Sequence, residues 1–115
     1  MNKLLVLLAT VFIGACGTLD DRTILINAGD AKQTVIDHLG VPFDRQFQGD
    51  LEAWQYCVSG AGFGYNDHKI VWFHNGVVSG ISTYSTTASG CESSAREIRW
   101  KEAPYYTGSV THITD

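Results

Sequence analysis

The sequence lacks several features that mark common classes of protein. Its main apolar run, residues 4–13, is too short to cross a bilayer. Basic residues are few, with 8 lysines and arginines against 12 aspartates and glutamates. Nucleic acids and anionic lipid surfaces both reward a clustered basic face. The charge balance therefore argues against either of them as an electrostatic partner.

Catalytic and metal-binding motifs are also missing. There is no C-x-x-C pair, and the serines at 89, 93 and 94 have no G-x-S-x-G or S-x-x-K context. The glycine-rich stretch at residues 59–67 precedes an expected strand, whereas a phosphate-binding loop needs a helix after it. His68 and His74 would lie roughly 20 Å apart on one strand, too far to share a metal. His38 and His112 have no metal-binding context. We predict no catalytic residue, metal, cofactor or small-molecule substrate, and therefore not an enzyme.

What is present begins with a leader. Residues 1–3 are basic, residues 4–13 are apolar and residues 14–15 are small, which is the layout of a secretory signal peptide. The run Ile13-Gly14-Ala15-Cys16 resembles a bacterial lipobox, which implies cleavage before Cys16 and attachment of diacylglycerol and a fatty acid such as palmitate. The alternatives are a plain signal peptide or a buried N-terminal helix. Gly17 is not aspartate, so the same resemblance implies delivery to the outer membrane, facing the periplasm.

Export would bring the two remaining cysteines, Cys57 and Cys91, into an oxidising compartment. Thiols in such a compartment tend to pair, so we predict a disulfide between them. A bridge that closes a loop of roughly 35 residues stabilises a small domain by about 4 kcal/mol. Two free buried cysteines are the alternative.

The first regular element is expected in the stretch NAGDAKQTVIDHLGVP. Asp30 stands at the N-cap position with Gln33 three residues later, as in a capping box. Gly40 offers a positive φ at the end, and Pro42 forbids continuation. The apolar residues at helical spacing are Ala31, Val35, Ile36 and Leu39. The pattern predicts an amphipathic helix of about ten residues.

After a linker at residues 43–50, the apolar period changes to two, which predicts strands. Residues 51–59 place Trp54, Tyr56 and Val58 on one face, and residues 68–85 form a hairpin around an Asn75-Gly76 type I′ turn. The predicted pairs are His74 with Val77, Phe73 with Val78, and Ile70 with Ile81. A fourth strand is expected at residues 96–101, where Ile98 and Trp100 alternate with charged residues.

These elements predict an α+β fold in which one or two short N-terminal helices pack on a three- to four-stranded antiparallel sheet. The expected organisation is a signal peptide (1–15), a lipidated N-terminus and tether (16–28), a folded domain (29–101) and a flexible C-terminal tail (102–115).

One family resembles this order of elements. The string GDAKQTVIDHLGVP, then WQY, then VWFHNGVV is similar to the SmpA/OmlA lipoproteins, outer-membrane components of the β-barrel assembly machinery, and to domains likened to the β-lactamase inhibitor protein. The resemblance covers residues 29 to about 84. It implies a periplasmic domain that binds an envelope protein, in outer-membrane protein assembly or envelope integrity.

The candidate contact residues are the aromatic side chains that flank the expected loops: Phe43, Phe47, Phe63 and Tyr65. Aromatic side chains are good anchors in protein interfaces. The alternative is that these rings complete a small core. A second function remains open, in which the stretch SGAGFGYND enters the cleft of a partner, as in a ligand-binding or enzyme-inhibitor module.

Overall fold

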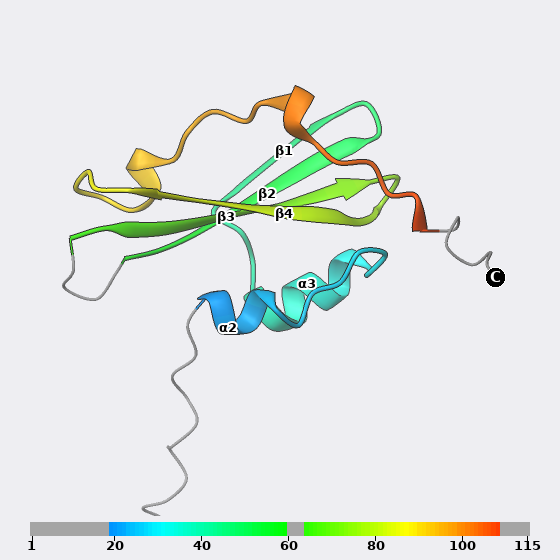
Figure 1. The fold of residues 1–115 in the computed structure, drawn as a ribbon, viewed down its shortest axis with the longest axis horizontal. Coiled ribbons are helices and arrows are strands. Elements are labelled where there is room, and N and C mark those ends of the chain that lie inside the picture. The colour runs from blue at the N-terminus through cyan, green and yellow to red at the C-terminus, as the bar shows by residue number, and fades with distance from the viewer. Residues whose placement is uncertain (1–18, 60–63, 109–115) are drawn as a thin grey trace, which may run out of the picture.

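The computed structural model describes residues 19–59 and 64–108. It confirms the α+β class, with a four-stranded antiparallel sheet in the order β1-β2-β3-β4 (Figure 1). The helices and strands are α2 (Leu19–Thr23), α3 (Lys32–Leu39), β1 (Asp44–Gln48), β2 (Leu51–Ser59), β3 (Asn66–His74) and β4 (Val77–Thr86). In the described part of the chain, no helix is both long enough and apolar enough to span a bilayer.

The sheet is covered on both faces (Figure 1). Helices α2 and α3 lie on one face, which we call the helix face. The segment after β4 crosses the other face, which we call the C-terminal face, and contains two 3₁₀ turns, η2 (Glu92–Ser94) and η3 (Trp100–Glu102). Each face has its own apolar cluster because neighbouring side chains of a strand point to opposite sides. The helix-face core is Leu19, Ile26, Val35, Leu39, Trp54, Tyr56, Val71, Phe73 and Val78. The C-terminal-face core is Leu51, Ala53, Ile70, Trp72, Ile98 and Ala103.

Helix α3 begins later than the capping-box pattern predicts, and that prediction is wrong. Its N-cap is Ala31, with no side-chain cap, and the Asp30 carboxylate accepts a hydrogen bond from the Asn27 N–H at 2.7 Å. The reason is that the backbone before the helix is bonded to the sheet. The Gly29 N–H donates to the Val78 carbonyl, and the Asp30 carbonyl accepts from the Val78 N–H. Asp30 therefore joins helix and sheet instead of capping the helix.

The β3–β4 hairpin has the predicted turn. Asn75 and Gly76 both have positive φ, and the pairs next to the turn are those expected. The predicted pairing of Ile70 with Ile81 is wrong, because a β-bulge shifts the register between Trp72 and Phe73. Phe73 pairs with Val78 but Trp72 pairs with Gly80, so Ser79 is the extra residue, and Ile70 pairs with Ser82. A turn motif fixes the register of the two strands only as far as the first bulge.

The fourth strand is not where the alternation predicts it. Residues 96–101 form no strand; Ile98 is buried against the sheet, and Trp100 meets Trp72 edge-to-face at 6.1 Å between ring centroids. The fourth strand is β1, within the segment predicted as a linker. Its sequence DRQFQ has no apolar alternation because four of its five side chains are exposed at the sheet edge. The alternation of apolar residues at 96–101 thus indicates side chains that pack onto the sheet, and not a strand that pairs within it.

Contacts extend beyond both ends of the expected domain. Within the predicted tether, α2 brings Leu19 into the helix-face core, and Ile26 joins it. Beyond residue 101, Ala103 is buried, and the Tyr106 N–H donates to Nδ1 of His74 at 3.0 Å. Cys57 and Cys91 form a disulfide, with their Cα atoms 5.9 Å apart. This bond ties the start of the C-terminal segment to β2.

Candidate functional site

The structure separates the predicted contact residues. Phe47 is 65% exposed on β1, and Tyr65 is 42% exposed just before β3. Phe47 pairs with Glu52, near the start of β2, whereas Tyr65 lies next to the pairing partner of Ser59 at the other end. At 3.3 Å per residue the two rings are roughly 20 Å apart along the sheet. They cannot form one small patch.

The other predicted residues are elsewhere. Phe43 is half-buried between α3 and β1, where its N–H donates to the Gln55 carbonyl at 3.0 Å. Phe63 and Cys16 lie outside the described residues, as do three glycine-loop neighbours of Phe63. The structure therefore tests neither the predicted insertion of the glycine-rich loop into a partner nor the predicted lipid anchor.

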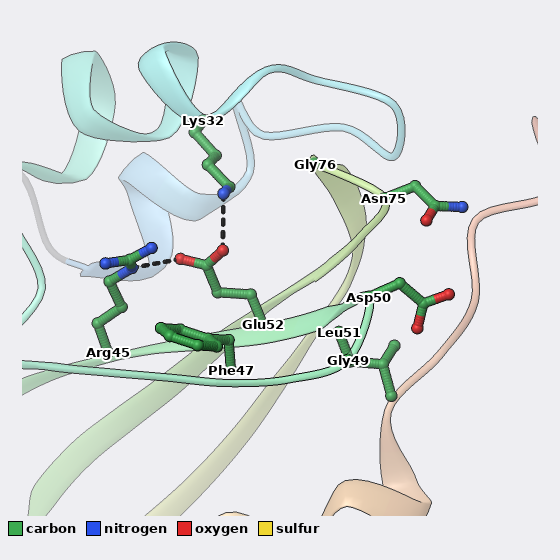
Figure 2. Close-up of a pocket in the computed structure, with 9 residues that line it drawn as sticks. All are labelled: Lys32, Arg45, Phe47, Gly49, Asp50, Leu51, Glu52, Asn75 and Gly76. Atoms are coloured by element: carbon green, nitrogen blue, oxygen red, sulfur yellow. Dashed lines mark hydrogen bonds and ion pairs between the residues drawn. The ribbon is translucent and has the colours of Figure 1, made fainter.

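An open pocket of about 330 Å³ lies beside Phe47 (Figure 2). Two hairpin turns, the start of α3 and the outer strand β1 surround it. Its lining consists of Lys32, Arg45, Phe47, Gly49, Asp50, Leu51, Glu52, Asn75 and Gly76. Four of the five residues of β1 are exposed, so the helix face of this strand is open where it borders the pocket.

The Glu52 carboxylate organises this pocket. Its side chain is 10% exposed, and it accepts from Lys32 Nζ at 2.6 Å and from Arg45 Nε at 2.5 Å. The Trp54 indole N–H donates to the same oxygen as Arg45, at 2.7 Å. Burial alone raises the pKa of Glu52, but the three hydrogen bonds and the charge of Lys32 outweigh it and hold the pKa below its ordinary value of 4.5. Glu52 is therefore a buried anion at neutral pH.

The side chains of Lys32 and Arg45 keep hydrogen-bond donors that Glu52 does not use. Lys32 is 38% exposed and Arg45 is 55% exposed. Arg45 uses only Nε on Glu52, and within residues 19–59 and 64–108 its terminal nitrogens have no hydrogen-bond partner. Its guanidinium lies 5.3 Å from the centroid of the Phe47 ring. The arrangement presents a fixed arginine stacked on an exposed aromatic ring.

Figure 2 shows how the lining side chains are directed. The Glu52 carboxylate lies between Lys32 from the helix and Arg45 from β1. The side chains of Asp50 and Asn75 point away from it. Asp50 contacts His74 instead, at 3.3 Å. The pocket's second acidic side chain therefore does not compete for the two cations.

Sequence reasoning missed the charged part of this pocket. The available signal was Glu52 itself, which shares the inward face of β2 with Trp54 and Tyr56. A carboxylate at an inward position of a strand needs a cation. Arg45 could not be assigned to it without the register of β1, nor Lys32 without the position of α3 on the sheet.

His68 is the other buried titratable group. It stacks on Tyr84 at 4.3 Å between centroids, and its Nε2 lies 2.9 Å from Thr86 Oγ1 and 3.4 Å from Ser94 Oγ. In the described part of the chain its Nδ1 has no hydrogen-bond partner. Burial chiefly lowers the pKa of His68; the charge of Arg96 lowers it further and that of Asp67 opposes the change. A Ser94–His68 pair without an acid on Nδ1 lacks the orienting group of a catalytic triad.

A search of residues 19–59 and 64–108 finds no group of three or more His, Cys, Asp or Glu side chains that could hold a metal ion. His68 and His74 stand at opposite ends of β3. Comparison with protein-family models, with curated proteins and with solved structures finds no match to this chain.

Proposed function

We propose that this protein is a lipid-anchored component of a bacterial envelope whose domain binds another envelope protein. The observation that supports the interaction is the surface formed by Arg45 and Phe47 with Lys32 and Glu52 behind them, which we call the β1 surface. Phe47 is 65% exposed although Trp54, Tyr56 and Phe73 on the same face are buried. Arginine and aromatic side chains are the types most enriched at the centres of protein interfaces.

The position of the β1 surface favours binding to a protein. Among residues 19–59 and 64–108, β1 is an outer strand of the sheet, and one of its backbone edges has no neighbouring strand. Such an edge can accept an extended segment of another chain. The Glu52 contacts fix Arg45 in advance, which reduces the entropy lost on binding.

The anchor is supported by the lipobox-like sequence before Cys16. Only two residues stand between Cys16 and Leu19, so acyl chains on Cys16 would hold α2 within about 11 Å of the membrane surface. Two or more acyl chains anchor a protein stably where one does not. Replacement of Cys16 by alanine should release a soluble periplasmic protein in membrane fractionation. A variant that stays in the membrane pellet would refute the anchor.

The interaction is tested by photocrosslinking in living cells. A photoreactive phenylalanine analogue at position 47 should give a discrete adduct with one envelope protein, identified by mass spectrometry. Tyr105 is the matched control, because it is an aromatic residue of similar exposure, 59%, in the C-terminal segment. No adduct at 47, or the same adducts at 47 and 105, contradicts the proposed interaction.

A further inference from the structure

We infer that the β1 surface binds an extended segment that carries a carboxylate side chain, so that the partner is recognised through an acidic strand. This inference rests on the proposed function and names the chemistry of the partner. It depends on three features: the unused donors of Arg45, the exposed ring of Phe47 and the free edge of β1.

The donors define the ligand group. Arg45 holds Glu52 through Nε alone, which leaves its two terminal nitrogens side by side for a second acceptor. A guanidinium binds a carboxylate best through two parallel N–H···O bonds. Lys32 Nζ also has spare donors beyond its contact with Glu52. Glu52 balances one of the two cations. The second lining carboxylate, Asp50, contacts His74 instead of either cation. A carboxylate of the partner would therefore balance the positive charge that remains beside Arg45.

The strand geometry sets the spacing within the ligand. Arg45 and Phe47 are two residues apart on β1 and lie on the same face, since their partners are Trp54 and Glu52. A segment that pairs with the edge of β1 would place alternate side chains beside them. The expected pattern is an acidic residue and an apolar residue two positions apart, the first on Arg45 and the second on Phe47.

The rest of the molecule limits how the segment is recognised. The chain is acidic overall, with a net charge of −4, so long-range attraction of an acidic partner is not expected. Recognition must come from contacts made after the encounter. Such contacts lower mainly the dissociation rate of the complex.

The test uses the full mature protein purified in detergent and fluorescent peptides with blocked termini. One peptide has Glu and Val two positions apart in a threonine background, and its twin has Gln in place of Glu. Fluorescence anisotropy should show the Glu peptide binding about tenfold or more tightly than the Gln peptide at low salt. Arg45→Lys keeps a cation for Glu52 but removes the paired donors, so it should reduce the preference for Glu at least severalfold.

Arg99→Lys, the same substitution at another arginine, is the matched control. Arg99 has the same 55% side-chain exposure and also pairs with a glutamate, Glu102, but it lies on the C-terminal segment. This variant should bind both peptides as the wild type does. Equal binding of the two peptides by the wild-type protein overturns the inference, whether or not Arg45→Lys folds. If that result accompanies a specific crosslink at 47, only the acidic ligand is wrong; if the crosslink is absent, the proposed function itself falls.

Discussion

On one face of the sheet, two helices cover the strands with regular backbone structure, whereas on the other face residues 87–108 cover them as an irregular segment with short 3₁₀ turns (Figure 1). Both faces bury apolar cores. The difference lies in how the covering backbone satisfies its polar groups. A helix pairs most of these groups internally, whereas the buried polar groups of an irregular segment that its own turns leave unpaired need other partners, such as side chains of the sheet.

The C-terminal face provides those partners from side chains of the strands. Gln55 donates to the Arg96 carbonyl, and the Tyr84 hydroxyl accepts from the Arg96 N–H at 2.9 Å. Asn66 donates to the Ala88 carbonyl at 2.9 Å. The Cys57–Cys91 disulfide adds a covalent tie on the same face. The irregular layer on the C-terminal face is thus held by hydrogen bonds from strand side chains and by a disulfide. The layer on the helix face is held by backbone hydrogen bonds to Val78 and by the ion pairs of Glu52.

Removal of the Cys57–Cys91 disulfide should have the largest effect, and it should destabilise the C-terminal face more than the helix face. The double variant Cys57→Ala/Cys91→Ala frees a loop with a sequence separation of 34 and should lower the free energy of unfolding by about 2–5 kcal/mol in urea titrations. Native-state hydrogen exchange should show the Arg96 amide losing more protection than the amide of Val71 in the central strand β3. Equal losses at both amides would mean that the two faces open as one unit.

Removal of the buried charge on the helix face should have the next largest effect. Glu52→Gln weakens the bonds to Lys32 and Arg45, and should cost about 1–3 kcal/mol in the free energy of unfolding. Because folding lowers the pKa of Glu52, its contribution is complete above its ordinary pKa of 4.5 and is lost as pH falls through the folded-state value.

The pH profile of unfolding separates this effect from a general loss of charge. The wild type should lose stability below about pH 4.5 more steeply than Glu52→Gln does. Glu97→Gln, which makes the same change at an exposed residue on the C-terminal segment, should follow the wild-type profile. Parallel profiles for wild type and Glu52→Gln would show that the carboxylate is not selectively stabilised.

The features of the fold that the sequence predicted correctly are those set by local signals. Asn75-Gly76 and the inward residues of β2 are local signals, and they gave the hairpin turn and the two faces of that strand. The glycine at position 80, next to the extra residue Ser79, is a local signal for a bulge, but the predicted pairing assumed a regular ladder and was wrong beyond it. Asp30 satisfied a capping pattern, but its backbone bonds to Val78 prevailed over it. There, long-range backbone pairing overrode a local preference.

The candidate site was less predictable than the fold. Phe47 was identified as an aromatic residue near an expected loop, but its neighbours Lys32 and Glu52 are 20 residues apart in the sequence. Their contact requires the register of β2 against the start of α3. β1 itself was taken for a linker because an exposed edge strand has no apolar period. Only tertiary structure could connect these residues.

Protonation of His68 should have the smallest effect and should act on the C-terminal face alone. Burial lowers the pKa of His68, so the unfolded chain binds a proton more readily than the folded one, and stability should fall as pH drops below the ordinary value of 6.5. A single group can contribute at most about 1.4 kcal/mol per pH unit. His68→Gln should flatten the unfolding profile between pH 7 and pH 5. The two charges near the ring act in opposite directions on the pKa of His68: Asp67 raises it, and Arg96, stacked on Tyr84 at 4.4 Å, lowers it, so burial decides the direction. A profile that His68→Gln leaves unaltered would show that the C-terminal face tolerates the imidazolium.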